Sequence, residues 1–214
     1  MRLLRALVDL VVPPTCASCG SGVPSDAARR LCPECRDLLA PLLKDPPRVP
    51  GAAQVICGWS FEGLLQDLVQ RLKYERELPL ARPLAELLVE AALAWDLEPH
   101  VVVPMPLSRA RQRARGFDHA WLLAGPVADA LDVSRVAALA RDDRPAQVGL
   151  NAEARRENPR GAFHPGADAA AVAGRTVLLV DDVITTGATC AEAVASLREA
   201  GAASVDVLLL GHAP

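Results

Sequence analysis

Residues 177–189 read VLLVDDVITTGAT, and this stretch decides how the rest of the chain can be interpreted. Its four leading aliphatic residues are typical of a strand buried on both faces, as in a parallel sheet. The run leads directly into Asp181 and Asp182. Two adjacent carboxylates repel each other at the end of a buried strand, unless they accept hydrogen bonds from a ligand or face a hydrated Mg²⁺ ion. The acidic pair therefore indicates a ligand site at the carboxyl end of this strand.

The residues that follow, TTGAT at 185–189, predict a phosphate-binding turn. Gly187 permits a tight bend in which backbone N–H groups point inward with the hydroxyls of Thr185, Thr186 and Thr189. The helix expected after the turn adds the positive end of its dipole. The turn has neither the lysine of a Walker A loop nor the spacing of a dinucleotide fingerprint. With the acidic pair it predicts a site for a phosphorylated sugar; the alternative is an ordinary connection with capping threonines and solvated aspartates.

Strand and helix patterns alternate along the rest of the chain. Aliphatic runs predict strands at 54–61, 100–106, 135–141, 176–180 and 204–211, and helical spacing of apolar residues predicts helices at 63–75, 81–95, 117–131 and 188–201. Gly125 and Pro126 should kink or interrupt the third of these helices. The alternation predicts an α/β fold, with a mostly parallel sheet flanked by helices on both faces. Ligands bind such sheets outside the carboxyl ends of the strands, which is where the acidic pair is expected.

Four cysteines near the N-terminus form a C-x2-C-x12-C-x2-C pattern, namely Cys16, Cys19, Cys32 and Cys35. Two such turns complete a tetrahedral sulfur site for zinc, and four thiolates leave no open position, so the predicted role is structural. A disulfide framework and a thioredoxin-like redox pair are the alternatives. The surrounding segment has too few apolar residues to fold without the metal. Cys57 and Cys190 lie apart from the four and are expected to be ordinary buried thiols.

The chain has 214 residues, enough for one medium domain with a small appendage, and its 51% hydrophobic content allows a sizeable core. Three prolines and a glycine within residues 44–51 indicate a stiff linker. The predicted units are an N-terminal helix and zinc ribbon at 1–45, a linker at 46–53 and the α/β domain at 54–214.

Net charge and hydropathy limit which partners and which cellular compartment are expected. The formal net charge of −3 predicts no general attraction to nucleic acid or to acidic membranes. Asp9 interrupts the apolar N-terminal run and no cleavage site follows it, which predicts a short amphipathic helix and not a signal peptide. No segment approaches the roughly 18 apolar residues of a membrane span. We therefore expect a cytoplasmic protein without membrane insertion, with reduced cysteines.

Residues 177–189 resemble the 5-phosphoribosyl diphosphate (PRPP) signature of type I phosphoribosyltransferases, and the whole chain resembles the ComF/GntX family, which joins a zinc ribbon to a phosphoribosyltransferase-like domain. Residues 72–77, 103–124 and 144–163 are similar to further blocks of that family, so the resemblance covers nearly the whole chain. The chain departs from it at Asp118 and His119, where the family commonly has Asn and Gln. The roles of these two positions are left open, with His119 expected to lie at the surface or to cap a helix.

The resemblance also implies roles for individual residues. Asp181 and Asp182 would engage the ribose hydroxyls beside Mg²⁺, and the turn that holds the 5-phosphate would comprise Thr185, Thr186, Gly187, Ala188 and Thr189. The family's pyrophosphate loop lies near Arg109, which is the catalytic candidate among the alternating arginines 109, 111, 113 and 115. An extended chain would place these arginines on one face, whereas a helix would scatter them, and a solvated basic surface is the alternative. Lys73 beside Tyr74, and Arg155 in a long loop that could close as a lid with Gln147 and Asn158, are further candidate PRPP ligands.

Three functional hypotheses follow from the resemblance. The first is Mg²⁺-dependent phosphoribosyl transfer to or from an unidentified acceptor, in which pyrophosphate leaves the anomeric carbon without a protein nucleophile. The second is a non-catalytic module that binds single-stranded DNA or senses PRPP among competence proteins, because the ComF family is associated with natural transformation. An aromatic content of only 3% weakens a base-stacking model. The third is a scaffold that has lost its ligand, against which the intact acidic pair and turn argue.

Overall fold

The computed structural model describes residues 15–23, 31–42, 44–143 and 162–213, and their centre is a five-stranded parallel sheet. Its strand order is β1–β7–β6–β2–β3, with every neighbouring pair parallel. The strands are β1 (Gln54–Ser60), β2 (Val101–Pro104), β3 (Ser134–Arg135), β6 (Thr176–Ile184) and β7 (Ser204–His212). The predicted α/β class is confirmed. The helix predicted within residues 1–14 lies outside the described residues.

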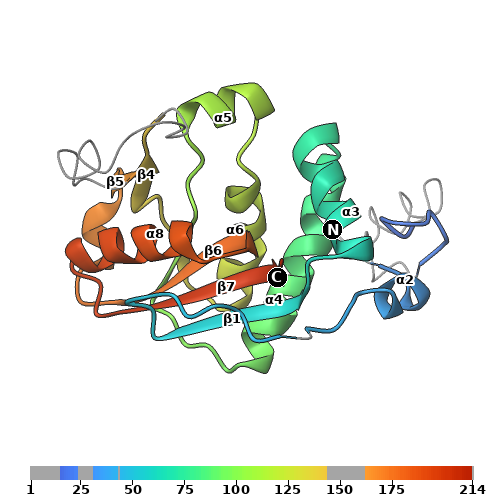
Figure 1. Cartoon of the computed structure of the whole chain (residues 1–214), viewed down its shortest axis with the longest axis horizontal. Helices are drawn as coiled ribbons and strands as arrows, with labels where there is room; N and C mark the ends of the chain where they lie inside the picture. The colour runs from blue at the N-terminus through green and yellow to red at the C-terminus, as the bar shows by residue number, and fades with distance from the viewer. Residues whose placement is uncertain (1–14, 24–30, 43, 144–161, 214) are drawn as a thin grey trace, which may run out of the picture.

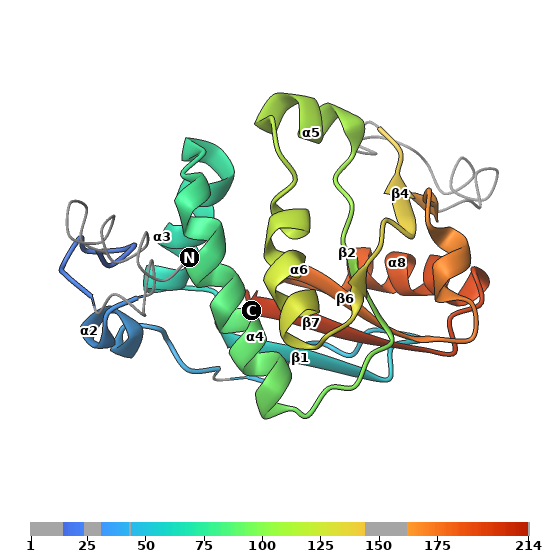
Figure 2. The ribbon, with the colours of Figure 1, turned by 180° about the vertical axis from the view of Figure 1, so that it is seen from behind.

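Helices cover both faces of this sheet, as the aliphatic strands require (Figures 1 and 2). Helices α4 (Ala81–Ala94) and α6 (His119–Ala130) pack on one face, against residues such as Leu178 and Val180 of β6. Helix α8 (Ala188–Glu199) packs on the other face, against the alternate residues Val177 and Leu179. Because successive strand residues point to opposite faces, one strand supplies both cores.

The N-terminal part of the sequence lies against the edge of the sheet that β1 forms. Its short helix α2 (Pro33–Asp37) contacts α4 through an ion pair between Arg36 and Glu90. The hydroxyl of Ser60, at the end of β1, donates to the carbonyl of Pro41 at 2.7 Å. Among the helices of the described ranges, none has the length and hydrophobicity needed to cross a bilayer.

Three predicted elements differ in the structure. The strand predicted at 135–141 is divided: β3 pairs with β2, whereas β4 (Leu139–Arg141) pairs with β5 (Phe163–Pro165) in a separate antiparallel pair. Helix α6 runs uninterrupted through Pro126, so of the predicted kink or interruption the interruption is wrong. The helix predicted at 63–75 is α3 (Gly63–Gln70) followed by a π-helical turn (Arg71–Glu75), which ends at Arg76 in a left-handed conformation with φ of 60°. Short 3-10 turns lie at Leu78–Leu80 and Ala169–Val172.

The arrangement of β2 and β6 creates a crevice at the carboxyl edge of the sheet. Strand β2 pairs with β6 only as far as Pro104 opposite Val180, whereas β6 continues beside β7 to Ile184. The chain after β2 leads to α6 on one face, and the chain after β6 leads to α8 on the other. Two neighbouring parallel strands whose connections depart to opposite faces leave a crevice between their carboxyl ends, the usual ligand site of such sheets.

Candidate functional site

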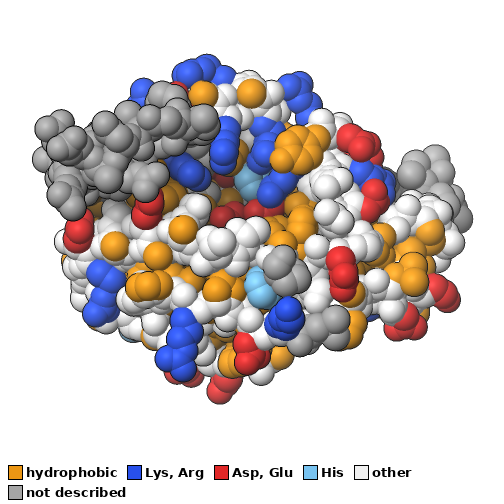
Figure 3. Space-filling view, viewed as in Figure 1, with side chains coloured by type: hydrophobic (Ala, Val, Ile, Leu, Met, Phe, Trp, Pro, Cys, Tyr) orange, Lys and Arg blue, Asp and Glu red, His pale blue; other side chains and the backbone are white. Residues whose placement is uncertain are grey.

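A hollow of about 630 Å³ occupies this crevice. Asp181, Asp182 and every residue of the turn 185–189 line it, together with Lys73 and Tyr74 from the π-helical turn. Figure 3 shows acidic side chains at the bottom of the hollow and basic side chains around its upper rim. The predicted acidic pair and phosphate turn therefore lie on one cavity. Both aspartates are part of strand β6, which is four residues longer than the predicted strand.

The two aspartates have different surroundings. Asp182 is only 4% exposed and forms an ion pair with the ammonium group of Lys73, while its Oδ1 lies 3.6 Å from Nε2 of His119. Burial by itself would raise the pKa of Asp182, but the contact with His119 and the charge of Lys73 outweigh it and hold this pKa below its usual value. Burial, followed by repulsion from Asp182, raises the pKa of Asp181 well above its usual value. Only Asp182 is thus stabilised as an anion before a ligand arrives.

The turn has the backbone geometry of an anion cradle. Gly187 adopts a φ of 78°, which L-residues other than glycine rarely accept, and it stands at the N-cap of α8 without offering a side-chain cap. Among the described residues, the first N–H groups of α8 are therefore left for a ligand, apart from a 3.4 Å hydrogen bond that Ala188 N donates to the hydroxyl of Thr186. A phosphate group would satisfy these donors.

The arginines after β2 lie on a helix, α5 (Arg109–Arg115), which separates them onto different sides. Arg111 and Arg115 line the hollow, whereas the predicted catalytic residue Arg109 does not. Arg113 is also absent from the lining and pairs with Asp143 at 3.2 Å. The guanidinium of Arg115 lies 5.6 Å from the ring centre of Tyr74, so α5 and the π-helical turn meet across the rim.

Two further cations on the hollow were not among the predicted site residues. Arg76 lines it and donates to the carbonyl of Ala114 at 2.9 Å. Arg141, on β4, lines it as well, and burial followed by the nearby charge of Arg111 lowers its pKa. The positive φ of Arg76 leaves no trace in the sequence, and nothing local connects Arg141 to a strand 35 or more residues away. Arg155, Gln147 and Asn158 lie outside the described residues.

The expectation for His119 was wrong. This residue is 4% exposed, begins helix α6 and faces the acidic pair, and its Nδ1 lies 2.7 Å from Nη1 of Arg115. One ligand atom from each of His119, Asp181 and Asp182 lies within 4.8 Å of the others. Its neighbour Asp118 has a local role, because its carboxylate caps α6 by accepting from the backbone N–H of Trp121 at 3.0 Å.

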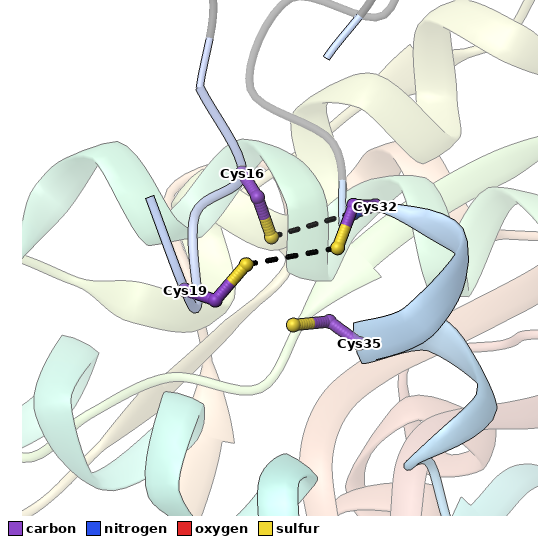
Figure 4. A group of neighbouring side chains, drawn as sticks. All are labelled: Cys16, Cys19, Cys32 and Cys35. Atoms are coloured by element: carbon purple, nitrogen blue, oxygen red, sulfur yellow. Dashed lines mark hydrogen bonds between the residues drawn. The ribbon is translucent and has the colours of Figure 1, made fainter. Parts of the chain in front are cut away.

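The four N-terminal cysteines converge on one point (Figure 4). Their sulfur atoms all lie within 4.8 Å of one another, and Sγ of Cys19 is 3.7 Å from Sγ of Cys32. A tetrahedral zinc site with Zn–S bonds of 2.3 Å has sulfur–sulfur edges of about 3.8 Å. The backbone N–H of Cys32 donates to Sγ of Cys16 at 3.3 Å, as backbone amides commonly do to metal-bound thiolates. The cluster could therefore hold a metal ion.

The pKa shifts of the thiols differ in direction even within the cluster: a hydrogen bond with Ser18 lowers the pKa of Cys35, but burial and the contact with Cys19 outweigh it and raise this pKa above its usual value. Hydrogen bonds with the side chain and the backbone of Ser21 lower the pKa of Cys19 to about 6, which favours the thiolate that a metal requires. Burial raises the pKa of Cys57 and of Cys190 to about 12, so both are poor ligands and poor nucleophiles. Cys190 nevertheless lines the hollow, where the nearby aspartates contribute to its shift.

Comparison with known proteins agrees with this geometry. The phosphoribosyl transferase domain family matches residues 118–211, which carry the acidic pair and the turn. The protein therefore contains a phosphoribosyltransferase domain. Competence protein F of Haemophilus influenzae is 33% identical over 207 residues, covering 94% of this chain and 85% of that protein. DNA utilization protein YhgH of Salmonella typhimurium is 31% identical, covering 91% and 88%. The chain belongs to the ComF/GntX family.

One similar solved structure is described as the allosteric regulatory enzyme of purine biosynthesis. It is 23% identical with a TM-score of 0.46, and the match covers 61% of this chain and 26% of that one. The chain spans about a quarter of that enzyme's length, and a likeness of this degree adds no argument about function.

Proposed function

We propose that the hollow binds PRPP with Mg²⁺ and transfers the phosphoribosyl group to or from an acceptor. One observation carries the proposal: the acidic pair, the amide-lined turn and a set of cations all face a single cavity of about 630 Å³. The carboxylates suit the ribose hydroxyls and the turn suits the 5-phosphate. Arg111 and Arg115 line the same hollow, and we assign the pyrophosphate to them.

This reaction requires the protein to position the acceptor and PRPP and to stabilise the negative charge that develops on the leaving pyrophosphate. The acceptor forms a bond to the anomeric carbon while the bond to the pyrophosphate oxygen breaks, and the leaving electron pair goes to pyrophosphate. Cationic donors stabilise that developing charge, which we assign to Arg111 and Arg115 in place of Arg109. Lys73 neutralises Asp182 in the ligand-free protein, so the ribose hydroxyls would enter a site already organised around this carboxylate.

Two metal ions belong to the proposal. The acidic pair offers oxygen ligands of the kind that Mg²⁺ prefers, directly or through water, and the ion would add positive charge beside the pyrophosphate. Asp181 and Asp182 would hold it. The four cysteines would hold zinc in a closed, structural site, consistent with the 3.7 Å sulfur–sulfur distance. Thiolate ligands require reduced cysteines, which supports a cytoplasmic location.

The test is release of pyrophosphate from PRPP over a panel of bases and small amines, preceded by thermal unfolding with PRPP and Mg²⁺. The double variant Asp181→Asn, Asp182→Asn should lose both the stabilising shift and the release. Arg111→Gln/Arg115→Gln should reduce them more than the matched variant Arg109→Gln/Arg113→Gln, which removes the same charge from the same helix. No thermal shift in the wild-type protein would exclude PRPP binding.

A second candidate is binding of single-stranded DNA, which the names of the relatives and the basic rim support. An electrostatic groove predicts retention of a labelled strand that falls steeply as salt increases. The same two arginine pairs separate the possibilities. Equal loss of retention in both variants would indicate that α5 contributes charge in general, and unchanged retention in both would exclude α5 as the DNA contact.

A further inference from the structure

We infer that His119 is a positioning residue, which in its neutral Nε2–H form links Arg115 to Asp182. This inference rests on the proposed function for its consequence, although its geometry can be tested without any ligand. The three side chains come from α5, α6 and β6, and together they connect the rim of the hollow to its acidic floor.

The proton position follows from the partners of the ring. A guanidinium group can only donate hydrogen bonds, so Nδ1 of His119 must be the acceptor of its 2.7 Å contact with Arg115. The single proton of the neutral ring then lies on Nε2, which faces Oδ1 of Asp182 at 3.6 Å. In an imidazolium ring Nδ1 would also carry a proton, and its N–H group would then face the N–H group of Arg115 with no acceptor between them. At 3.6 Å this is an electrostatic contact longer than a hydrogen bond, and such contacts commonly shorten when a ligand closes the site.

The same proton rules out a metal-ligand role for His119 in this arrangement. Nε2 is the ring atom closest to the acidic pair, and a metal would require its lone pair, which the N–H bond occupies. His119 is 4% exposed, so water cannot easily replace either of its partners. The ring is therefore an internal bridge, although its distance to the aspartates would also suit a metal ligand.

The bridge has two effects on the site. It holds Arg115, which uses one N–H group on His119 and keeps others for the pyrophosphate. It also gives Asp182 a polar neighbour in addition to Lys73, so this carboxylate is oriented from two sides. Without the ring, Arg115 would be free to turn toward solvent, and Lys73 would be the remaining cationic contact of Asp182 within the described part of the chain.

A matched pair of variants tests the bridge. In His119→Gln the amide oxygen can accept from Arg115 and the amide N–H can donate to Asp182, whereas His119→Leu fills similar space and does neither. We expect His119→Leu to weaken PRPP binding in the presence of Mg²⁺ by roughly 10- to 100-fold, as loss of a hydrogen bond to a charged group does. His119→Gln should restore most of that loss. Calorimetric titration gives the dissociation constants, and far-UV circular dichroism checks the fold.

Other outcomes overturn the inference. If both variants bind as the wild type does, His119 positions nothing; if both are equally weak, the acceptor and donor groups that glutamine keeps are not what His119 contributes, and the bridge is wrong. Long-range ¹H–¹⁵N NMR of the ligand-free wild-type protein provides a separate test, with the His119 signal assigned by its absence in His119→Gln. The expected pattern is the Nε2–H tautomer, and an Nδ1–H or imidazolium pattern would overturn the inference. Should wild-type protein not bind PRPP, the proposed function fails, and the tautomer still decides whether the bridge exists.

Discussion

The cysteine module (residues 15–42) and the sheet domain (residues 54–213) are stabilised in different ways. In the domain, aliphatic side chains such as Leu178 and Val180 are completely buried between sheet and helices. In the described part of the module, the buried side chains are the metal-ligand candidates Cys16, Cys32 and Cys35 together with Leu31 and Leu39, and they pack against the core of the domain. A segment this short gains little from hydrophobic burial of its own, so we expect the convergence of its thiols to depend on a bound metal.

Removal of the metal should have the largest effect. We expect a chelator, or Cys32→Ser, to unfold the module, because apparent zinc-binding free energies are on the order of 10 kcal/mol. The sheet domain should keep its fold. Limited proteolysis with mass spectrometry would detect cleavage before residue 54, and metal content would be measured in parallel. Cys57→Ser is the control, since this buried thiol lies outside the cluster. A module that resists proteolysis without metal would contradict the comparison.

The next largest effect concerns the buried ion pair of the sheet domain. Lys73→Met should destabilise the protein by about 3 kcal/mol, because it leaves the carboxylate of Asp182 buried with a partner removed. Urea unfolding followed by fluorescence measures this loss. Adding Asp182→Asn to Lys73→Met should recover part of it, since the uncompensated charge is then gone. No recovery would mean that Lys73 acts through packing alone.

Two glycines with left-handed backbone conformations, one in each region, allow the stabilities of the two regions to be tested separately. Gly187, in the sheet domain, and Gly20, in the module, adopt φ values of 78° and 75°. Replacement by alanine at either position should cost about 1 kcal/mol in backbone strain. Gly187→Ala should lower the unfolding temperature of the domain, whereas Gly20→Ala should reduce zinc affinity and leave that temperature unchanged. A shift of the domain transition in Gly20→Ala would indicate that module and domain unfold together.

The smallest effect is expected where the two regions touch. Arg36 and Glu90 form an ion pair whose side chains are each 44% exposed. Solvent screens such a pair, so Arg36→Met should change the free energy of unfolding by less than about 1 kcal/mol. Urea unfolding in low and in high salt would measure it. A loss comparable with that of Lys73→Met would show that the contact between the regions is worth more than its exposure suggests.

Much of the fold was predictable because strand and helix patterns are local. The runs at 54–61 and 204–211 are strands, and the pattern at 81–95 is a helix, close to the predicted bounds. The division of 135–141 was not predictable. Val136 N still donates to Val102 of β2 at 2.9 Å, and the chain then leaves to pair with β5, a partner that only the tertiary structure supplies. The extension of β6 likewise depends on β7 continuing beside it.

The candidate site also has a part that the sequence predicted and a part that only the tertiary structure supplies. The acidic pair and the turn 185–189 follow each other in the sequence, so their residue types alone predicted a site for a phosphorylated sugar. The spacing of the four cysteines likewise predicted a metal site. Lys73 was a candidate, but its partner Asp182 is more than 100 residues away. Nothing near His119 in the sequence identified Asp182 as its neighbour.

The sequence by itself determined the chemistry that the chain carries: two carboxylates, a glycine that permits a left-handed turn, and four thiols. Only the tertiary structure decided which cations face that chemistry, because the order of strands brings α5, α6, β4 and the π-helical turn to one edge of the sheet. The physical reason for this difference is the distance along the chain over which each kind of interaction acts. Backbone conformation and turn formation depend on neighbouring residues, whereas electrostatic partners are chosen by proximity in space.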